Sequence, residues 1–296
     1  YKGDGDVQQL QPIKVGEGIA GKVFEKGEPL IINDSDPVAG HGRSSICVPL
    51  IFKDETIGVL SVSDKLSGDT FDKGDLEILV TLASQIAVSL YNAQLYEELE
   101  SSYLSAVKTL ANSIDAKDAY TSGHSERVAR YAVETGRIMG LDADDLKNLH
   151  IGALLHDIGK IGISEAIITK SAKLTAEEYE TIKTHPARGA TIIEPAVFLA
   201  EKVPLIRYHH ERYDGKGYPE GLKGEQIPLL ARIVCVADSF DAMTSKRAYR
   251  DVMPLKEARE EILRCSGSQF DPDVVAAFMK LLADENKVRA IEKTGK

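Results

Sequence analysis

The sequence lacks tryptophan and holds only three cysteines among its 296 residues. These are Cys47, Cys235 and Cys265, an odd number with no C-x-x-C spacing. Such a set argues against a disulfide framework and against a cysteine-type zinc site. Reduced thiols are typical of the cytoplasm, so we expect a cytoplasmic protein.

Excess positive charge and long apolar runs are also missing. The formal net charge is −10, and the sequence pI is near 5.3. This balance argues against a broad basic face that binds long nucleic acid, although a few local cations can still hold a small anionic nucleotide. No apolar run approaches the length of a membrane span, so we expect no membrane segment here. Tyr1 is not a natural start, which predicts that the sequence is a piece of a longer chain.

The length predicts about two domains, and the apolar content of 43% is ordinary for soluble globular proteins. Residues 1 to about 70 read as a small α/β unit. A short helix is expected over residues 17–25, ending near Gly27. Strands are expected over 29–33, 45–52 and 56–63, and the last two are separated by the hairpin-like Lys53-Asp54-Glu55.

Three short motifs give this first half a resemblance to a GAF sensory domain. They are Gly16-Glu17-Gly18-Ile19-Ala20-Gly21, Val48-Pro49-Leu50-Ile51 and Ile57-Gly58-Val59-Leu60. The resemblance implies an α+β domain over residues 1–95, with an antiparallel sheet flanked by helices, whose early part is missing. It also implies an unknown small-molecule ligand, since GAF domains share a fold but not a ligand.

A long helix is predicted over residues 72–115, because neither proline nor glycine occurs from Asp75 to Ser122. Apolar residues within it step by three and four, at Tyr96, Leu99, Tyr103, Ala106 and Leu110. This is a short heptad seam, which predicts a parallel homodimer. The alternative is a long helix packed within one chain.

The second half, residues 116–296, is predicted to be all-α. Thr175-Ala176-Glu177-Glu178 is a capping box that begins one helix. Asp271-Pro272 places a capping residue before a proline at the first helical position of another helix. Asp142 and Asp145 are expected to open a third helix.

The stretch Leu154-Leu155-His156-Asp157-Ile158-Gly159-Lys160 stands at the centre of this half. The adjacent His156 and Asp157 offer one nitrogen ligand and one carboxylate that can bridge two cations. The apolar residues before them predict a buried helix, with Gly159 as its C-terminal stop. A hydrogen-bonded His–Asp pair within a helical domain is the alternative interpretation.

Six of the seven histidines fall in the helical half. Four histidines and two aspartates spread over about 80 residues suit a site with nitrogen and oxygen ligands and no thiolate. The ligand types therefore indicate Fe or Mn, with Zn as a further alternative.

A larger set of ordered motifs resembles the HD-GYP family of metal-dependent phosphodiesterases over about residues 105–285. They are His156-Asp157-Ile158-Gly159-Lys160, His185-Pro186-x-x-Gly189, His209-His210-Glu211-Arg212, Gly217-Tyr218-Pro219, Asp238-Ser239-Phe240-Asp241-Ala242-Met243-Thr244, Arg247-Ala248-Tyr249-Arg250 and Phe270-Asp271-Pro272. The resemblance implies an HD-type helical domain that hydrolyses cyclic di-GMP to linear pGpG, with GMP as a possible further product. The reaction would use a metal-bridged hydroxide, and the GAF domain would regulate it.

The resemblance also implies a binuclear metal centre, with Fe as the first expectation and Mn or Zn as alternatives. Its ligands would be His156, Asp157, His185, His209, His210 and Asp238, with Asp157 bridging. Asp157 and Lys160 would be catalytic. Substrate contacts would come from Lys160, Tyr218, Arg247, Arg250 and Asp241.

The roles of His124 and His150 are less clearly indicated by the motifs. Relatives with a third metal carry a Glu four residues before the equivalent of His124, where this chain has Tyr120. We therefore predict two metals, with His124 either beside the ligands or a weak ligand of a third site. His150 matches no ligand position and is predicted to be structural. Two alternatives to the function stay open: an HD-type hydrolase of another nucleotide, and a degenerate module that binds cyclic di-GMP and signals to a partner without turnover.

Overall fold

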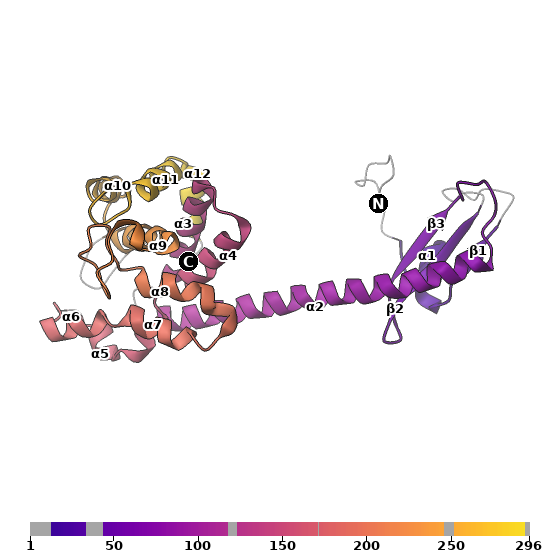
Figure 1. Ribbon diagram of the computed structural model, residues 1–296, viewed down its shortest axis with the longest axis horizontal. Helices are drawn as coiled ribbons and strands as arrows, with labels where there is room; N and C mark the ends of the chain where they lie inside the picture. The colour runs from indigo at the N-terminus through magenta and orange to yellow at the C-terminus, as the bar shows by residue number, and fades with distance from the viewer. Residues whose placement is uncertain (1–12, 34–43, 118–122, 171, 246–251, 294–296) are drawn as a thin grey trace. The chain divides into compact units, whose positions relative to one another are not determined.

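The computed structural model describes residues 13–33, 44–117, 123–170, 172–245 and 252–293 (Figure 1). The chain divides into two compact units, Tyr1–Ser101 and Ser102–Lys296. One helix, α2 (Lys73–Lys117), has residues in both units. It confirms the long helix expected from residues 72–115.

The first unit contains a three-stranded antiparallel sheet in the order β1-β2-β3. Its elements are α1 (Gly18–Lys26), β1 (Leu30–Ile32), β2 (Ser45–Phe52), β3 (Glu55–Ser63) and the first part of α2. Lys53 and Asp54 join β2 to β3 with φ angles of 47° and 67°. Positive φ at both positions is what a two-residue hairpin of this twist requires, so the predicted hairpin is confirmed.

The core of this unit is small. Ile46, Val48 and Leu50 of β2 pack with Ala83 and Ala87 of α2, and all five side chains are buried. The two alanines lie four residues apart on one helix face, where their small side chains let the helix approach the sheet closely.

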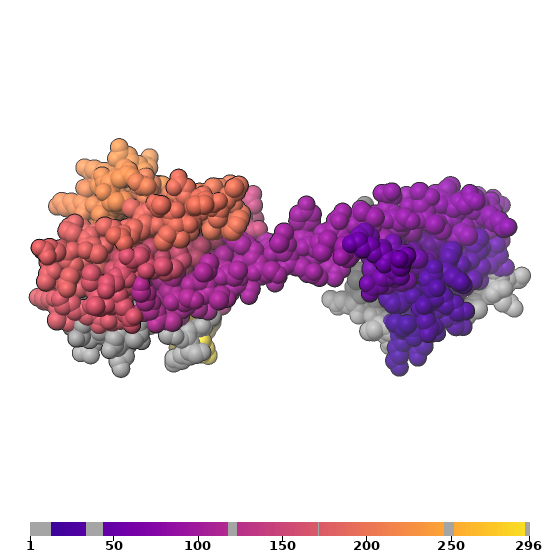
Figure 2. Space-filling view, turned by 90° about the horizontal axis from the view of Figure 1, so that it is seen from below, coloured from indigo at the N-terminus to yellow at the C-terminus, as the bar shows by residue number. Residues whose placement is uncertain are grey.

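Other apolar side chains of α2 remain exposed. Every residue from 92 to 102 is exposed, and Figure 2 shows this stretch of the helix surface. Tyr96 is 74% exposed and Leu99 is 68% exposed, whereas Tyr103 packs edge-on against Phe198 of its own chain at 4.8 Å between ring centroids. The predicted seam is therefore partly used within the chain at Tyr103, and its dimer remains a prediction.

Among the described residues, α2 is also long and apolar enough to cross a membrane by length and composition alone. Only 11% of its apolar window is buried, and a single helix of this kind is weak evidence for a membrane span. The criterion is consequently weak for this helix.

The second unit is helical apart from its loops and one isolated bridge, from Ser266 to Phe270, among the described residues. Tyr131, Phe240 and Phe278 lie at its centre, with ring centroids 5.1 to 5.9 Å apart. The elements are α3 (His124–Met139), α4 (Ala143–Leu154), η2 (Ile158–Gly162), α5 (Glu165–Ile168), α6 (Ala176–Ile182), α7 (His185–Ile193), η3 (Val197–Lys202), α8 (Val203–Tyr208), η4 (Gly224–Gln226), α9 (Leu229–Thr244), α10 (Leu255–Arg264), α11 (Pro272–Leu282) and α12 (Glu285–Glu292).

The predicted helix starts are confirmed by hydrogen bonds. The Asp142 carboxylate accepts from the backbone N–H of Asp145, 2.8 Å away, at the start of α4. Thr175 and Glu178 form the reciprocal capping box of α6. Asp271 accepts backbone N–H groups of the first turn of α11. Each side chain satisfies donors that the helix itself leaves unpaired.

Gly159 does not end a helix, which corrects the sequence-based expectation. The helix α4 ends at Leu154, and Gly159 lies within the 3₁₀ turn η2. A Cβ atom at Gly159 would come within 1.9 Å of the His185 carbonyl oxygen, and one at Gly189 would lie 3.2 Å from the Gly159 nitrogen. The two glycines therefore let α7 lie directly on η2, which brings His185 next to Asp157.

Candidate metal centre

Three histidines follow the C-terminal ends of helices and share one hydrogen-bond pattern. The Nδ1 atoms of His156, His185 and His209 lie 2.7, 2.8 and 2.8 Å from the carbonyl oxygens of Ala153, Ile182 and Ile206. Those carbonyls belong to the last turns of α4, α6 and α8, which have no helical donor. A carbonyl oxygen only accepts, so each Nδ1 carries a hydrogen and Nε2 is left as the ring atom that can bind a metal ion. This second hydrogen bond is typical of histidines that bind metals.

The Asp157 carboxylate lies between these rings. Its Oδ1 is 3.2 Å from Nε2 of His185, and its Oδ2 is 3.4 Å from Nε2 of His156. The two oxygens thus face different histidines. Burial alone would raise the pKa of Asp157, but the Lys160 ammonium and the His156 imidazole bring it well below its ordinary value. The carboxylate is held ionised, as a cation ligand must be.

One group of potential ligands consists only of imidazoles: His185, His209 and His210. The Nε2 atoms of His185 and His209 are 3.3 Å apart. Burial, together with the neighbouring imidazoles, lowers the pKa of His209 well below its ordinary value and that of His210 to about 3. Because the Nδ1 atoms of His185 and His209 both donate to carbonyl oxygens, the two facing Nε2 atoms can offer their lone pairs to one cation. These residues therefore fit a metal ion.

A second group contains His124, His156 and Asp238. The Asp238 Oδ1 lies 3.3 Å from His124 Nε2 and 3.9 Å from His156 Nε2. The buried Nε2 of His156 has no hydrogen-bond partner among the described residues. An orphaned buried nitrogen is costly, and a cation shared with Asp238 would satisfy it. This group therefore also fits a metal ion.

Asp241 and Arg127 orient the His124 ring through its Nδ1 atom, on the side away from Asp238. Its Nδ1 lies 2.7 Å from Oδ2 of Asp241, and Asp241 also accepts from Nε and Nη2 of Arg127, 2.6 and 3.0 Å away. Burial lowers the pKa of His124, but Asp238 and Asp241 more than offset it and raise the pKa to about 9. The arrangement turns Nε2 of His124 toward the second group.

Asp241 was predicted to contact substrate, and its surroundings in the structure are those of a buried support. The residue is 1% exposed, and its carboxylate is used by His124, Arg127 and Ser245. Sequence reasoning did not find Arg127. It lies one turn after His124 on α3, but its partner is 114 residues away, so no local pattern pairs the two.

Lys160 lies beside the Asp157 carboxylate, and Lys117, the last residue of α2, lies beside the turn that carries Lys160. Lys160 Nζ donates to Oδ2 of Asp157 over 2.6 Å. Lys117 Nζ donates to the carbonyl oxygens of Lys160, Ile161 and Ile163 over 3.2, 3.1 and 2.7 Å. The last residue of the long helix therefore holds the turn that carries Lys160, a contact that the sequence did not reveal.

The Gly217-Tyr218 loop lies beside the imidazole group. The Tyr218 ring centroid is 4.9 Å from that of His210, and the Tyr218 N–H donates to the His210 carbonyl over 3.3 Å. A Cβ atom at Gly217 would come within 2.3 Å of the Arg212 backbone nitrogen, so only glycine fits there.

Glu211 fixes the far end of this loop. Its side chain is buried, and its Oε1 accepts the backbone N–H groups of Glu220 and Gly221 over 2.7 and 3.0 Å. Glu211 follows two predicted ligands in sequence, yet its structural part was not predicted because it depends on a loop nine residues ahead.

The structure thus brings together six predicted ligands and adds His124 beside them. Lys160 and Tyr218 lie against this cluster. A third group of potential ligands, His156, Asp157 and His209, joins the other two, and His150 belongs to none of the three. The predicted substrate contacts Arg247 and Arg250, and Tyr120, on which the two-metal prediction depended, lie outside the described residues.

The fold and the site define the class of this unit: an all-α domain whose clustered histidines and Asp157 lie at helix ends, with Asp238 inside α9. Comparison with protein families then identifies it: residues 108–274 match the HD domain, and residues 1–90 match the GAF domain. The chain belongs to the HD domain family and carries an N-terminal GAF domain. The resemblance found in the sequence is confirmed at this level.

Among curated proteins, the chain is 39% identical over 204 residues to a cyclic di-GMP phosphodiesterase of Thermotoga maritima, covering 68% of this chain and 55% of that protein. It is 38% identical over 206 residues to 3'3'-cGAMP-specific phosphodiesterase 3 of Vibrio cholerae, covering 68% and 45%. The chain therefore spans about half the length of these relatives. A crystal structure of a cyclic GMP-AMP specific phosphodiesterase of V. cholerae superimposes with a TM-score of 0.52 at 22% identity, covering 64% of this chain and 50% of the other, which confirms the fold.

Proposed function

We propose that this chain is a metal-dependent phosphodiesterase that hydrolyses cyclic di-GMP to linear pGpG, with further hydrolysis to GMP left open. The observation that carries the proposal is the convergence of the six predicted ligands, with one oxygen of Asp157 toward each histidine group. Two relatives are named as phosphodiesterases of cyclic di-GMP and of 3'3'-cGAMP, which supports a cyclic dinucleotide as the substrate class.

In this proposal two metal ions are held by the two groups. His185, His209 and His210 form one site. His124, His156 and Asp238 would form the other, and Asp157, whose two oxygens face His156 and His185, would serve both. This assigns His124 as a ligand of the second metal, which would displace the ring proton that Asp238 and Asp241 stabilise. Imidazole and carboxylate donors without thiolates suit Fe first, with Mn or Zn as alternatives.

The reaction divides between the metals and the chain. When bound, the metal ions would supply positive charge at the attacked phosphate and lower the pKa of the attacking water. Lys160 is close enough to Asp157 to place its ammonium beside an oxygen of a phosphate bound at the metal centre. Arg127 and Asp241 keep the His124 ring in place, so we now propose a positioning role for Asp241.

The remaining predicted substrate contacts fit this arrangement. Tyr218 presents its ring next to His210, where a base or sugar of the substrate can pack. Arg247 and Arg250 remain predictions for phosphate and guanine contacts.

The direct test is a substrate panel on protein purified without oxygen and loaded separately with Fe and Mn. We expect turnover of cyclic di-GMP, with pGpG and any further GMP detected by chromatography. Preferential turnover of 3'3'-cGAMP, the substrate in the name of one relative, would change the substrate. Binding of cyclic di-GMP without turnover at full metal occupancy would instead favour the signalling module.

We further propose that the GAF domain regulates this site through α2 in a cytoplasmic homodimer. The exposed Tyr96 and Leu99 support a helix-to-helix contact, and Lys117 links the end of α2 to the carbonyl of Lys160. A small-molecule ligand of the GAF domain would act by shifting this helix. Unchanged activity and oligomeric state after removal of residues 1–95 would contradict the coupling.

A further inference from the structure

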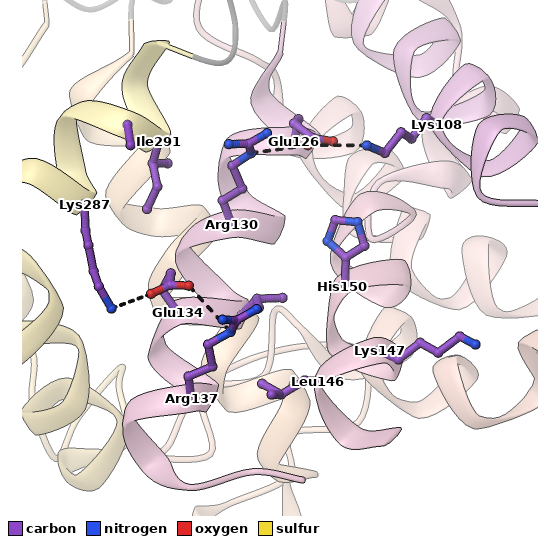
Figure 3. Close-up of a pocket in the computed structure, with 12 residues that line it drawn as sticks. Lys108, Glu126, Arg130, Glu134, Arg137, Leu146, Lys147, His150, Lys287 and Ile291 are labelled. Carbon is purple, nitrogen blue, oxygen red and sulfur yellow. Dashed lines mark hydrogen bonds and ion pairs between the residues drawn. The ribbon is translucent and has the colours of Figure 1, made fainter. Parts of the chain in front are cut away.

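A cavity of about 650 Å³ lies in the second unit, and none of the candidate metal ligands lines it (Figure 3). Its walls come from the end of α2, from α3, α4 and α12. The volume falls within the range of small-molecule sites, roughly 300–1,000 Å³. Nothing in the sequence motifs predicted a site here.

The face of α3 that lines this cavity is distinct from the face that serves the metal centre. Glu126, Arg130, Glu134 and Arg137 recur at spacings of four, four and three residues, so they lie along one side of the helix. His124, which begins the same helix, points to Asp238 and Asp241 instead. One helix therefore carries both sites without sharing a side chain between them.

The lining is strongly cationic although the whole chain carries a net charge of −10. Five lining residues are basic, and only Glu126 and Glu134 are acidic. Glu126 is shared by two cations: Lys108 at 3.7 Å and Arg130 at 3.3 Å.

Glu134 is shared in the same way, by Arg137 at 3.6 Å and Lys287 at 2.7 Å (Figure 3). A carboxylate that serves two cations does not use all of their donors, because a guanidinium has five N–H groups and an ammonium three. The cavity therefore holds positive charge and donors in excess of its own acids.

His150 adds a polar group to this lining. Its ring is half-buried, and none of the hydrogen bonds found among the described residues involves it. Burial, with Lys108 and Arg130 nearby, lowers the pKa of His150 despite the opposing charge of Glu126. A neutral imidazole beside the cavity, as Figure 3 shows, offers one donor and one acceptor to a ligand.

The rest of the lining is apolar and includes Val133, Leu146 and Ile291. We propose that this cavity binds an organic phosphate of nucleotide size, with its phosphates on the cationic residues and its base on the apolar side. Charge-assisted hydrogen bonds from Arg130 and Arg137 would supply most of the recognition, since guanidinium groups match phosphate geometry. This second site does not depend on the proposed function of the metal centre.

The test measures binding of ATP, GTP and inorganic pyrophosphate to the full chain by calorimetry, without added metal. We expect saturable binding of at least one nucleotide, and binding weaker by about 10- to 100-fold in the double variant Arg130→Gln/Arg137→Gln. The variant Asp157→Asn, altered in the metal centre, is expected to bind equally well. The matched control Arg264→Gln removes an exposed arginine on α10 and should change nothing.

Circular dichroism of the double variant checks that it folds, and His150→Asn provides a second, milder change within the cavity. We expect His150→Asn to weaken binding severalfold, by the loss of one ring contact. Absence of saturable binding to all three probes would overturn the proposal. Binding that is lost in Asp157→Asn and kept in the double variant would also overturn it, because the nucleotide would then occupy the metal centre.

Discussion

The two units of the chain bury different kinds of side chain. Around its apolar core, the second unit buries charged or ionisable groups, among them His124, Asp157, Glu211 and Asp241. In the described part of the first unit, the buried polar residues are Ser44 and Ser45. Burying a charge is costly unless it is paired, so a concentration of such groups marks where a fold serves chemistry rather than stability.

Both units expose some apolar side chains, such as Val197 in the second unit, but many of those in the first unit lie on one helix. In the first unit, α2 exposes Ile78, Leu82 and Leu90 on the helix that covers the sheet. Exposed apolar side chains gathered on one helix typically mark an interaction site. The comparison thus places the reaction in the interior of the second unit and subunit association on the exposed surface of α2. Mutations can test each of these two roles.

The largest effect is expected from Asp157→Asn. The amide keeps the shape of the side chain but removes the charge that faces both histidine groups. We expect turnover to fall by at least ~10²–10³-fold, the loss typical of a pre-organised electrostatic contact. Metal content measured by elemental analysis should fall in parallel.

The matched control is Asp144→Asn, which changes an exposed acid on α4, the helix that precedes His156. It should leave both metal content and turnover unchanged. If Asp157→Asn retained full metal occupancy, Asp157 would be an ordinary buried acid. The buried charged groups of the second unit would then no longer indicate a metal centre.

Gly159→Ala tests whether the second unit needs close packing at its site. The added Cβ would meet the His185 backbone oxygen, which cannot move without shifting α7. We expect a loss of roughly 2–4 kcal/mol in the free energy of unfolding, measured by chemical denaturation. Gly162→Ala in the same turn is the control, because its nearest neighbour is the flexible Arg188 side chain at 3.2 Å. Equal losses in both variants would contradict the packing role of Gly159.

Local sequence patterns predicted the elements whose causes are local. The capping residues Asp142, Thr175 and Asp271 and the hairpin at Lys53 act within a few residues of themselves. Gly159 was misread because a glycine in a close interhelical contact and a glycine at a helix end look alike in sequence.

The motifs also located the ligands but not what holds them. Arg127 pairs with Asp241 over 114 residues, and Lys117 reaches carbonyls more than 40 residues away. Tyr103 fits a seam by its spacing, yet it packs against Phe198 of its own chain. Such contacts depend on tertiary structure, which spacing along one helix does not contain.

Asp241→Asn examines the support of the second metal group. The carboxylate accepts from His124 and pairs with Arg127, so its neutralisation weakens the orientation of the His124 ring. We expect metal affinity to fall about 10- to 100-fold, the usual range for residues that hold a ligand in place. Competition with a chelator would measure it. Ser245→Ala, which removes one hydroxyl from the same cluster, should have a smaller effect. An unchanged metal affinity in Asp241→Asn would show that His124 is not a ligand.

The smallest effect is expected from Leu99→Asp on the exterior of α2. Leu99 is 68% exposed, and it lies on the predicted seam between Tyr96 and Tyr103. If the seam forms a dimer, this leucine becomes buried there, and replacing it by a charge loses about 1.5–3 kcal/mol of apolar burial. The dimer dissociation constant should rise at least about tenfold, as sedimentation or light scattering at several concentrations would show. Ser101→Asp places the same charge two residues away, on the side of the helix opposite the seam, and should leave the dimer intact. Equal behaviour of the two variants would exclude this seam as the contact, and the exposed apolar side chains of α2 would then require a different partner.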